Sequence, residues 1–119
     1  MKNKFFAIAS LILLISACAA LPTDSKSWNI MIPLTPGKEL TINLVDKSGF
    51  NVDIENPAND TLIIRGANYN KPLVNDKVSL SVLDGNLIEI LNVSKKNVKP
   101  TVRVYNHKAK VITAVTEIK

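Results

Sequence analysis

The chain has 119 residues, a formal net charge of +5 and a hydrophobic content of 46%. This length is enough for one domain with a modest core. The single cysteine excludes a disulfide within the chain, so apolar burial and strand pairing must close the core.

The first seventeen residues have the pattern of an export signal. Lys2 and Lys4 precede an apolar run from Phe5 to Ala17, in the order of a positive n-region followed by a hydrophobic h-region. The run is shorter than the about 20 apolar residues that cross a bilayer as a helix. We therefore expect residues 1–17 to be a signal-peptide helix that is removed on export.

The last four residues of this signal, Ile15-Ser16-Ala17-Cys18, resemble the lipobox of bacterial lipoproteins. The resemblance implies cleavage just before Cys18, a diacylglyceryl thioether on its thiol and an acyl chain on its new amine. One acyl chain anchors only marginally, whereas three should hold the protein in the bilayer. Ala19 stands where retained inner-membrane lipoproteins of enteric-type bacteria tend to carry Asp, which implies the outer membrane. The alternative is an ordinary secreted protein, because Ala17-Cys18-Ala19 also fits an A-x-A cleavage pattern.

The mature chain is expected to divide into a lipidated tether, residues 18–27, and a single β domain, residues 28–119. Apolar and polar residues alternate through most of this domain, which is typical of half-buried strands. No segment after Cys18 shows a convincing helical period. About eight short strands predict an all-β fold, a small antiparallel β-sandwich or meander. A short β-solenoid is the alternative.

Turn residues separate the expected strands. Thr35-Pro36-Gly37-Lys38 fits a β-turn. Asp46 to Gly49 is expected to close a four-residue hairpin loop, and Asp84-Gly85 is the strongest hairpin signal in the chain because both residues tolerate positive φ. The run from Leu87 to Val93 is apolar on both faces, which predicts a central strand. The polar stretch from Gly66 to Asp76 is expected to be a loop.

Part of the β domain resembles the head GIN domains of exported bacterial proteins described as autotransporter adhesins. Ser48 to Ile54, followed by Leu62 to Gly66, looks like the opening of these domains. Val82 to Leu87 and Val102 to Tyr105 fall in the same order as the next strands of that family. The resemblance implies a solenoid-like fold and an adhesive role, and it carries over no catalytic residue.

The sequence offers little for catalysis or metal binding. Its one histidine, His107, stands in an Asn-His-Lys turn and is expected to be a solvated loop residue rather than a general base. Asp53 and Glu55 lie two apart on one expected strand, with Asp60 just beyond the following turn. They lack the spacing of a dedicated Ca²⁺ loop, so an exposed strand face is expected rather than a metal site. With Cys18 taken up by lipid, no nucleophile–base grouping remains. The sequence therefore predicts no enzyme, no metal and no cofactor.

The basic C-terminal third is the one candidate binding feature. From Ser94 onward the only acidic residue is Glu117. An anion-binding patch that contacts lipid phosphates or an anionic envelope polymer would consist of Lys95, Lys96, Lys99, Lys108 and Lys110. The other interpretation is that these lysines keep exposed strand edges from pairing with neighbours. Only Tyr105 is nearby to stack on a base, so nucleic acid is not expected as a partner.

These features together predict a lipid-anchored protein of the bacterial envelope, held in the outer membrane, that acts as a non-catalytic binding or structural module in adhesion or polymer contact. The expected partners are the membrane, through the N-terminal lipid, and an anionic envelope polymer or another envelope protein. One alternative is an accessory or inhibitor subunit that docks on an exported protein through the Gly66–Asp76 stretch and its strand edges. The other is a small enzyme.

Overall fold

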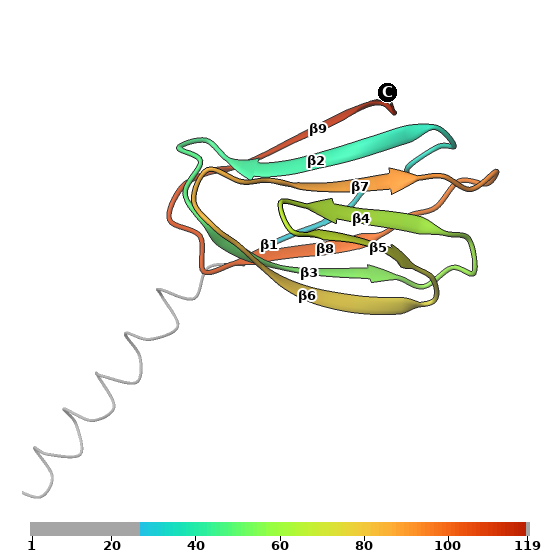
Figure 1. The fold of residues 1–119 in the computed structure, drawn as a ribbon, viewed down its shortest axis with the longest axis horizontal. Helices are drawn as coiled ribbons and strands as arrows, with labels where there is room; N and C mark the ends of the chain where they lie inside the picture. The colour runs from blue at the N-terminus through green and yellow to red at the C-terminus, as the bar shows by residue number, and fades with distance from the viewer. Residues whose placement is uncertain (1–26, 119) are drawn as a thin grey trace, which may run out of the picture.

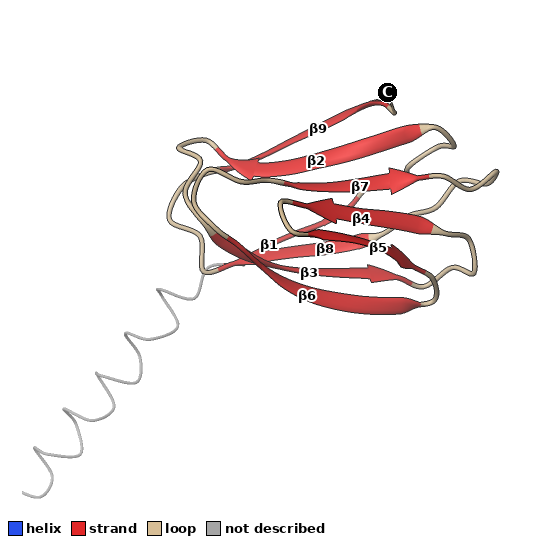
Figure 2. Ribbon diagram, in the orientation of Figure 1, coloured by secondary structure: helices blue, strands red, loops and turns tan. Residues whose placement is uncertain are grey.

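The computed structural model describes residues 27–118, so the expected signal peptide and Cys18 lie outside the described residues. The described chain folds into β-strands joined by loops and turns (Figures 1 and 2). None of its segments is a helix of the length and hydropathy needed to cross a membrane. The strands are β1 Ser27–Met31, β2 Lys38–Leu44, β3 Phe50–Asn56, β4 Leu62–Gly66, β5 Tyr69–Leu73, β6 Asp76–Val82, β7 Ile88–Asn92, β8 Thr101–Tyr105 and β9 Val111–Glu117.

The strands form two antiparallel sheets that pack face to face (Figure 1). One sheet has the order β1-β8-β3-β6 and the other the order β5-β4-β7-β2-β9. Only β4 and β5 are neighbours both in sequence and in a sheet, so every other connection crosses from one sheet to the other. Strands β1 to β8 therefore have the order of a double-sheet jelly roll, and β9 extends one sheet beside β2.

The expected antiparallel sandwich is confirmed, and its Greek-key crossings replace both a meander and a solenoid. The two expected hairpins, at Asp46 to Gly49 and at Asp84-Gly85, are wrong because each of these loops joins strands of different sheets. The two loops bond to each other instead: the Gly85 N–H donates to the Lys47 carbonyl oxygen at 2.7 Å, and the Gly49 N–H to Asp84 Oδ1 at 2.7 Å. The turn residues thus predict where the chain reverses direction, but they do not predict which strands pair with each other.

Of three other local expectations, two are confirmed and one is wrong. The turn at Thr35 to Lys38 is confirmed, with Gly37 at φ 80° and the Lys38 N–H donating to the Thr35 carbonyl oxygen at 3.2 Å. The apolar run from Leu87 to Val93 contains β7, which is a central strand between β4 and β2. The stretch from Gly66 to Asp76 is not a loop, because it contains the edge strand β5.

The core lies between the two sheets and is apolar. Alternate residues of most strands point inward, and Trp28 of β1 packs against this core and is half-buried. The buried members of the core are Leu34, Leu40, Ile42, Leu44, Phe50, Val52, Ile54, Leu62, Ile64, Leu73, Val82, Ile88, Ile90, Val98, Val102, Val104 and Val111.

The loops of the sandwich lie at its two ends. Ser27, the first residue of β1, pairs with Tyr105, the last residue of β8. We call the end where β1 begins the proximal end; its loops are 45–49, 67–68, 83–87 and 106–110. The distal end carries loops 32–37, 57–61, 74–75 and 93–100. Strands of five to seven residues separate the two ends, which corresponds to roughly 20 Å.

Candidate functional site

The space between the sheets offers no chemistry to a ligand. Within residues 27–118 the buried polar or charged residues are Glu39, Asn56 and Asn92. Glu39 belongs to the outer face, and the two asparagines bond to the loops of the distal end. No group of three or more His, Cys, Asp or Glu in this part of the chain is placed to hold a metal ion. A binding site must therefore lie on an outer face or at an end.

The outer face of the four-stranded sheet is polar and hollowed. Strand register places Asn29, Arg103, Asp53 and Ser79 side by side across β1, β8, β3 and β6. A hollow of about 270 Å³ opens over this row. The polar residues that line it are Asn29, Asp53, Glu55, Lys77, Ser79, Thr101 and Arg103.

Three of the side chains on this face hold one another in position. Arg103 Nη1 donates to Asp53 Oδ2 at 3.1 Å, and the Tyr105 hydroxyl donates to Asp53 Oδ1 at 3.3 Å. The Arg103 guanidinium also lies over the Tyr105 ring, 4.4 Å from its centroid, in a cation–π arrangement. Fixed donors and acceptors of this kind lose little conformational entropy when a ligand binds. The two cations of the hollow, Arg103 and Lys77, are matched by two carboxylates, which suits a neutral polar ligand better than a polyanion.

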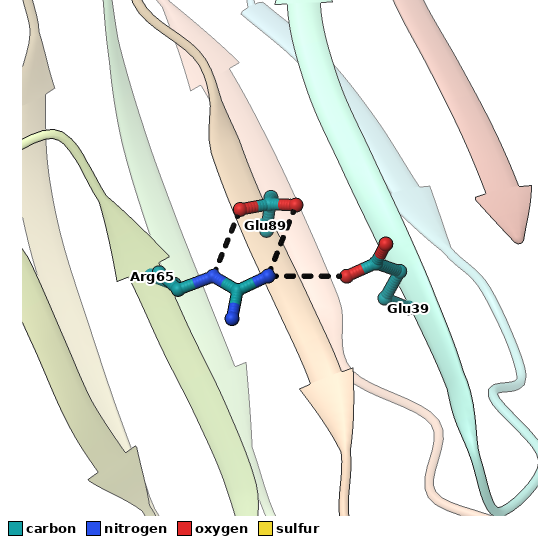
Figure 3. Close-up of polar contacts among 3 residues, drawn as sticks. All are labelled: Glu39, Arg65 and Glu89. Carbon is teal, nitrogen blue, oxygen red and sulfur yellow. Dashed lines mark hydrogen bonds and ion pairs between the residues drawn. The ribbon is translucent and has the colours of Figure 1, made fainter. Parts of the chain in front are cut away.

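The outer face of the five-stranded sheet carries a second charge cluster, formed by Glu39, Arg65 and Glu89 (Figure 3). Arg65 Nε and Nη2 donate to the two carboxylate oxygens of Glu89 at 2.9 and 3.4 Å, and Nη2 lies 3.5 Å from Glu39 Oε2. The hydrogen bonds and charge of Glu89, with the charge of Glu39, raise the pKa of Arg65.

This cluster has the character of a cross-strand lock. Its residues come from β4, β7 and β2, three adjacent strands, and the Arg65 guanidinium reaches from β4 to contact both carboxylates (Figure 3). The Glu39 side chain is only 9% exposed, and its Oε2 accepts no hydrogen bond from the described residues. A buried carboxylate depends on its counter-ion, so we assign Arg65 to holding these strands together rather than to a ligand.

A second hollow, of about 240 Å³, lies towards the proximal end between the β4–β5 turn and the β6–β7 loop. Tyr69 lines it and also packs against the core, so this ring both fastens β5 and faces the hollow. Leu83 and Leu87, which are 69% and 38% exposed, stand at its rim. Much of this hollow is lined by apolar side chains, among them Tyr69, Leu80, Val82 and Ile88.

The five lysines expected to form one patch do not form one. Lys95, Lys96 and Lys99 lie exposed in loop 93–100 at the distal end, whereas Lys108 and Lys110 lie exposed in loop 106–110 at the proximal end. Strand β8 runs the length of the domain between these loops. Closeness in sequence was misleading because a single strand carries the chain across the whole sandwich.

The remaining candidate residues are placed as follows. His107 is half-buried rather than fully solvated, and its Nδ1 lies 2.9 Å from the Ala109 carbonyl oxygen, to which it donates. Asp53 and Glu55 share the outer face of β3, as expected, and Asp60 lies in loop 57–61 at the distal end. Cys18, the expected lipidation site, lies outside the described residues.

Neither arginine cluster is expected from the sequence. The sequence suggests Asp53 only as a candidate metal ligand and Tyr105 only as a group that could stack on a base. The local signal was present, because Arg103 and Tyr105 alternate with the buried Val102 and Val104. The pairing of β8 with β3 could not be read, because these strands are far apart in the sequence.

Comparison with known proteins connects this fold with known jelly rolls. No protein-family model matches the chain, and no curated protein sequence does. Among solved structures, a sugar phosphate isomerase from a cupin superfamily, from Silicibacter pomeroyi, aligns with a TM-score of 0.54 at 14% identity, over 78% of this chain and 68% of that one. A predicted oxalate decarboxylase from Thermotoga maritima aligns with a TM-score of 0.51 at 11% identity, over 73% and 71%.

A protein of Bacillus halodurans aligns with a TM-score of 0.53 at 10% identity, over 79% of this chain and 71% of that one. At these identities the likeness concerns the fold alone. Proteins described as enzymes occur among the neighbours, but a fold does not determine a function. The function must therefore be argued from the surfaces described above.

Proposed function

We propose that this chain is a lipid-anchored, non-catalytic module of the bacterial envelope that binds a hydroxyl-rich envelope polymer on the outer face of its four-stranded sheet. The lipobox-like residues that end in Cys18 support the anchor. The polar hollow around Asp53 and Arg103 supports the binding role, and it is the observation on which the proposal depends.

The chemistry of the hollow suits sugar hydroxyls. The Arg103 fork donates in a plane, and the Asp53 carboxylate accepts, so together they can bond to neighbouring hydroxyl groups. Asn29, Ser79 and Thr101 add donors and acceptors along the edges of the hollow. A polymer presents the same groups many times over, so several anchored copies can bind one chain with avidity.

A catalytic role has less support. The core contributes only apolar side chains between the sheets, and His107 is bonded within its own loop to the Ala109 carbonyl. A nucleophile within reach of a base and an orienting group is the usual requirement for covalent catalysis. The surfaces described above offer binding groups in fixed positions but no such grouping.

Co-sedimentation of the purified lipoprotein with peptidoglycan sacculi, and separately its binding to lipopolysaccharide, tests the proposal. Arg103→Gln removes the charged guanidinium but keeps a polar side chain. We expect it to weaken binding by roughly tenfold or more, which is the effect of losing one charge-assisted hydrogen bond. Circular dichroism shows whether the variant keeps its β-sheet content.

The matched control replaces Lys95, Lys96 and Lys99 by Gln at the distal end. We expect this triple variant to bind as the parent does, because the hollow is charge-balanced and none of the three lysines lines it. Loss of binding in the triple variant, with binding retained in Arg103→Gln, would transfer the site to the lysines and overturn the assignment to the sheet face.

One observation favours a second candidate, an accessory subunit that docks on an exported protein. The hollow beside Tyr69, with Leu83 and Leu87 at its rim, offers the apolar anchor site that protein partners use. A crosslinked complex with one stoichiometric protein, lost on Tyr69→Ser and unaffected by Arg103→Gln, would support this candidate over polymer binding.

A further inference from the structure

The place where the chain enters the domain limits how an anchored domain can lie. Ser27 begins β1 at the proximal end and follows Cys18 by nine residues. Even fully extended, nine residues span at most about 32 Å. If Cys18 is lipidated, the chain from the anchor enters the sandwich at the proximal end, which follows Cys18 more closely along the chain than the distal end does.

Three loops at this end are bonded into one surface. The Val45 N–H donates to the Lys110 carbonyl oxygen at 2.9 Å, which joins loop 45–49 to loop 106–110. The Gly85 N–H donates to the Lys47 carbonyl oxygen at 2.7 Å, which joins loop 45–49 to loop 83–87. We call these three loops the base; Figure 1 shows them together at one end of the sheets.

The base presents apolar and cationic side chains. Leu83 is 69% exposed and Val45 is 58% exposed. Exposed lysines come from two of the three loops: Lys47 from loop 45–49, and Lys108 and Lys110 from loop 106–110. Protruding apolar residues beside lysines suit the boundary between anionic head groups and acyl chains.

The acidic side chains of the base are already occupied. Asp84 accepts the Gly49 N–H at 2.7 Å, and Asp46 accepts the N–H of Ser48 at 3.0 Å and its hydroxyl. Both carboxylates are therefore tied to groups of loop 45–49, whereas the three lysines are exposed and outnumber them.

Composition alone does not select this end, because the distal end also exposes apolar residues, Val74 and Val93, and the lysines of loop 93–100. The two ends differ in their distance from Cys18 along the chain. From this connection and the charge of the base we infer that the domain stands on the bilayer that holds its own acyl chains, with Val45 and Leu83 at the level of the anionic head groups. The inference rests on the lipid anchor of the proposed function.

This orientation would set the strands upright on the membrane. The polar hollow of the four-stranded sheet would then face sideways, open to a polymer lying above the bilayer. The loop with Lys95, Lys96 and Lys99 would be farthest from the lipid. The orientation thus separates a lipid-facing base from a ligand-facing sheet.

The test uses the full lipidated protein in vesicles of phosphatidylethanolamine and phosphatidylglycerol. Because Cys18 is alkylated, Leu83→Cys provides the single free thiol for an environment-sensitive fluorophore, and Val93→Cys provides the matched distal control. We expect a nitroxide on the lipid acyl chains to quench the label at position 83 several-fold more than the label at 93, and aqueous iodide to do the reverse. Replacing Lys47, Lys108 and Lys110 by Gln should reduce this difference in anionic vesicles.

Flotation of each labelled protein with the vesicles separates the possible failures. A protein that floats but whose label at 83 is as open to iodide as the label at 93 retains its anchor and overturns the lipid-contacting base. A protein that does not float overturns the anchor, and the inference with it. Stronger lipid quenching at position 93 would show the opposite orientation.

Discussion

Asn56 and Asn92, the last residues of β3 and β7, make the same set of hydrogen bonds at the distal end of the two sheets. Each side chain is fully buried, its Nδ2 donates to two carbonyl oxygens at 2.8 Å, and its Oδ1 accepts the N–H two residues ahead at 3.0 Å. The acceptors are the carbonyls of Asp60 and Leu73 for Asn56, and those of Leu34 and Lys96 for Asn92.

The shared pattern explains how the distal loops are held. An amide has two donors and an acceptor on one short side chain, so each asparagine can both start an Asx turn and tie it to another segment. For Asn92, that other segment is Leu34, which also pairs with Val98. The two residues fasten the β3–β4 and β7–β8 crossings between the sheets.

Asn92→Ala should therefore be costly. It removes the hydrogen bonds to the Leu34 and Lys96 carbonyl oxygens and those from the Ser94 N–H and hydroxyl, and leaves a cavity where the amide was fully buried. We expect a loss of about 2–3 kcal/mol in the free energy of unfolding. Urea denaturation followed by circular dichroism measures it. Asn51→Ala, at a half-exposed asparagine on the outer face of β3, is the control, with an expected change within about 0.5 kcal/mol. Equal losses in the two variants would contradict the role assigned to Asn92.

Gly49 is needed because a neighbouring backbone leaves no room for a side chain. A Cβ there would lie 2.7 Å from the Val82 carbonyl oxygen and 3.2 Å from Asp84 Oδ1, whereas at Gly66 the nearest atom is the movable Cδ1 of Ile88 at 3.1 Å. We expect Gly49→Ala to lower the free energy of unfolding by about 1–3 kcal/mol and Gly66→Ala to cost clearly less. Thermal unfolding of the two variants under one set of conditions decides the order, and a larger loss for Gly66→Ala would refute it.

Arg65 and Arg103 both pair with carboxylates on outer sheet faces, but they should differ in their effect on stability. The Glu39 side chain beside Arg65 is 9% exposed, whereas that of Asp53 beside Arg103 is 35% exposed. Arg103→Met should cost about 0–1 kcal/mol, as for other exposed pairs. Arg65→Met should cost more, because it leaves a buried carboxylate without its counter-ion. Chemical denaturation that gave the reverse order would disprove the lock across β4, β7 and β2.

Acid should weaken the β2–β3 loop through Asp46. The hydroxyl and N–H of Ser48 both donate to this carboxylate and lower the pKa of Asp46. Since the folded pKa lies below the unfolded one, about 3.9, the contribution is present above that pH and is lost as the pH falls through the folded pKa. The stability difference between the parent and Asp46→Asn should therefore be larger at pH 7 than at pH 2.

Denaturation curves across this range measure the effect of pH, and Ser48→Ala should reproduce part of the change, because it removes one of the two donors. A difference between the parent and Asp46→Asn that stays constant with pH, or that grows towards acid, would show that the Ser48 bonds do not hold the carboxylate in its charged form.

Features that depend on neighbouring residues in the sequence could be predicted, whereas contacts between segments far apart in the sequence could not. Period-two alternation gave the strands, and the apolar run around Ile88 to Leu91 gave a central strand, because burial acts on each strand locally. The Asp84-Gly85 turn gave a reversal, with Gly85 at φ 83°, but not its use, because its loop bonds to Lys47 of another loop.

The candidate site could be predicted less well than the strands. The polar hollow joins Asn29, Asp53, Ser79 and Arg103 from four strands, and only the Greek-key order brings these residues together. Five lysines that are close in sequence suggest one surface. However, three of them precede β8 and two follow it, so they lie at opposite ends of the sandwich. Register between strands distant in sequence is the information that local patterns lack.

The lipid anchor at Cys18, on which the proposed function and the orientation both depend, is tested by intact-mass analysis of the protein extracted from membranes. We expect a mature chain that begins at Cys18 and carries the added mass of a diacylglyceryl group and an amide-linked acyl chain. A mature chain that begins after Cys18, or one with an unmodified thiol, would contradict it.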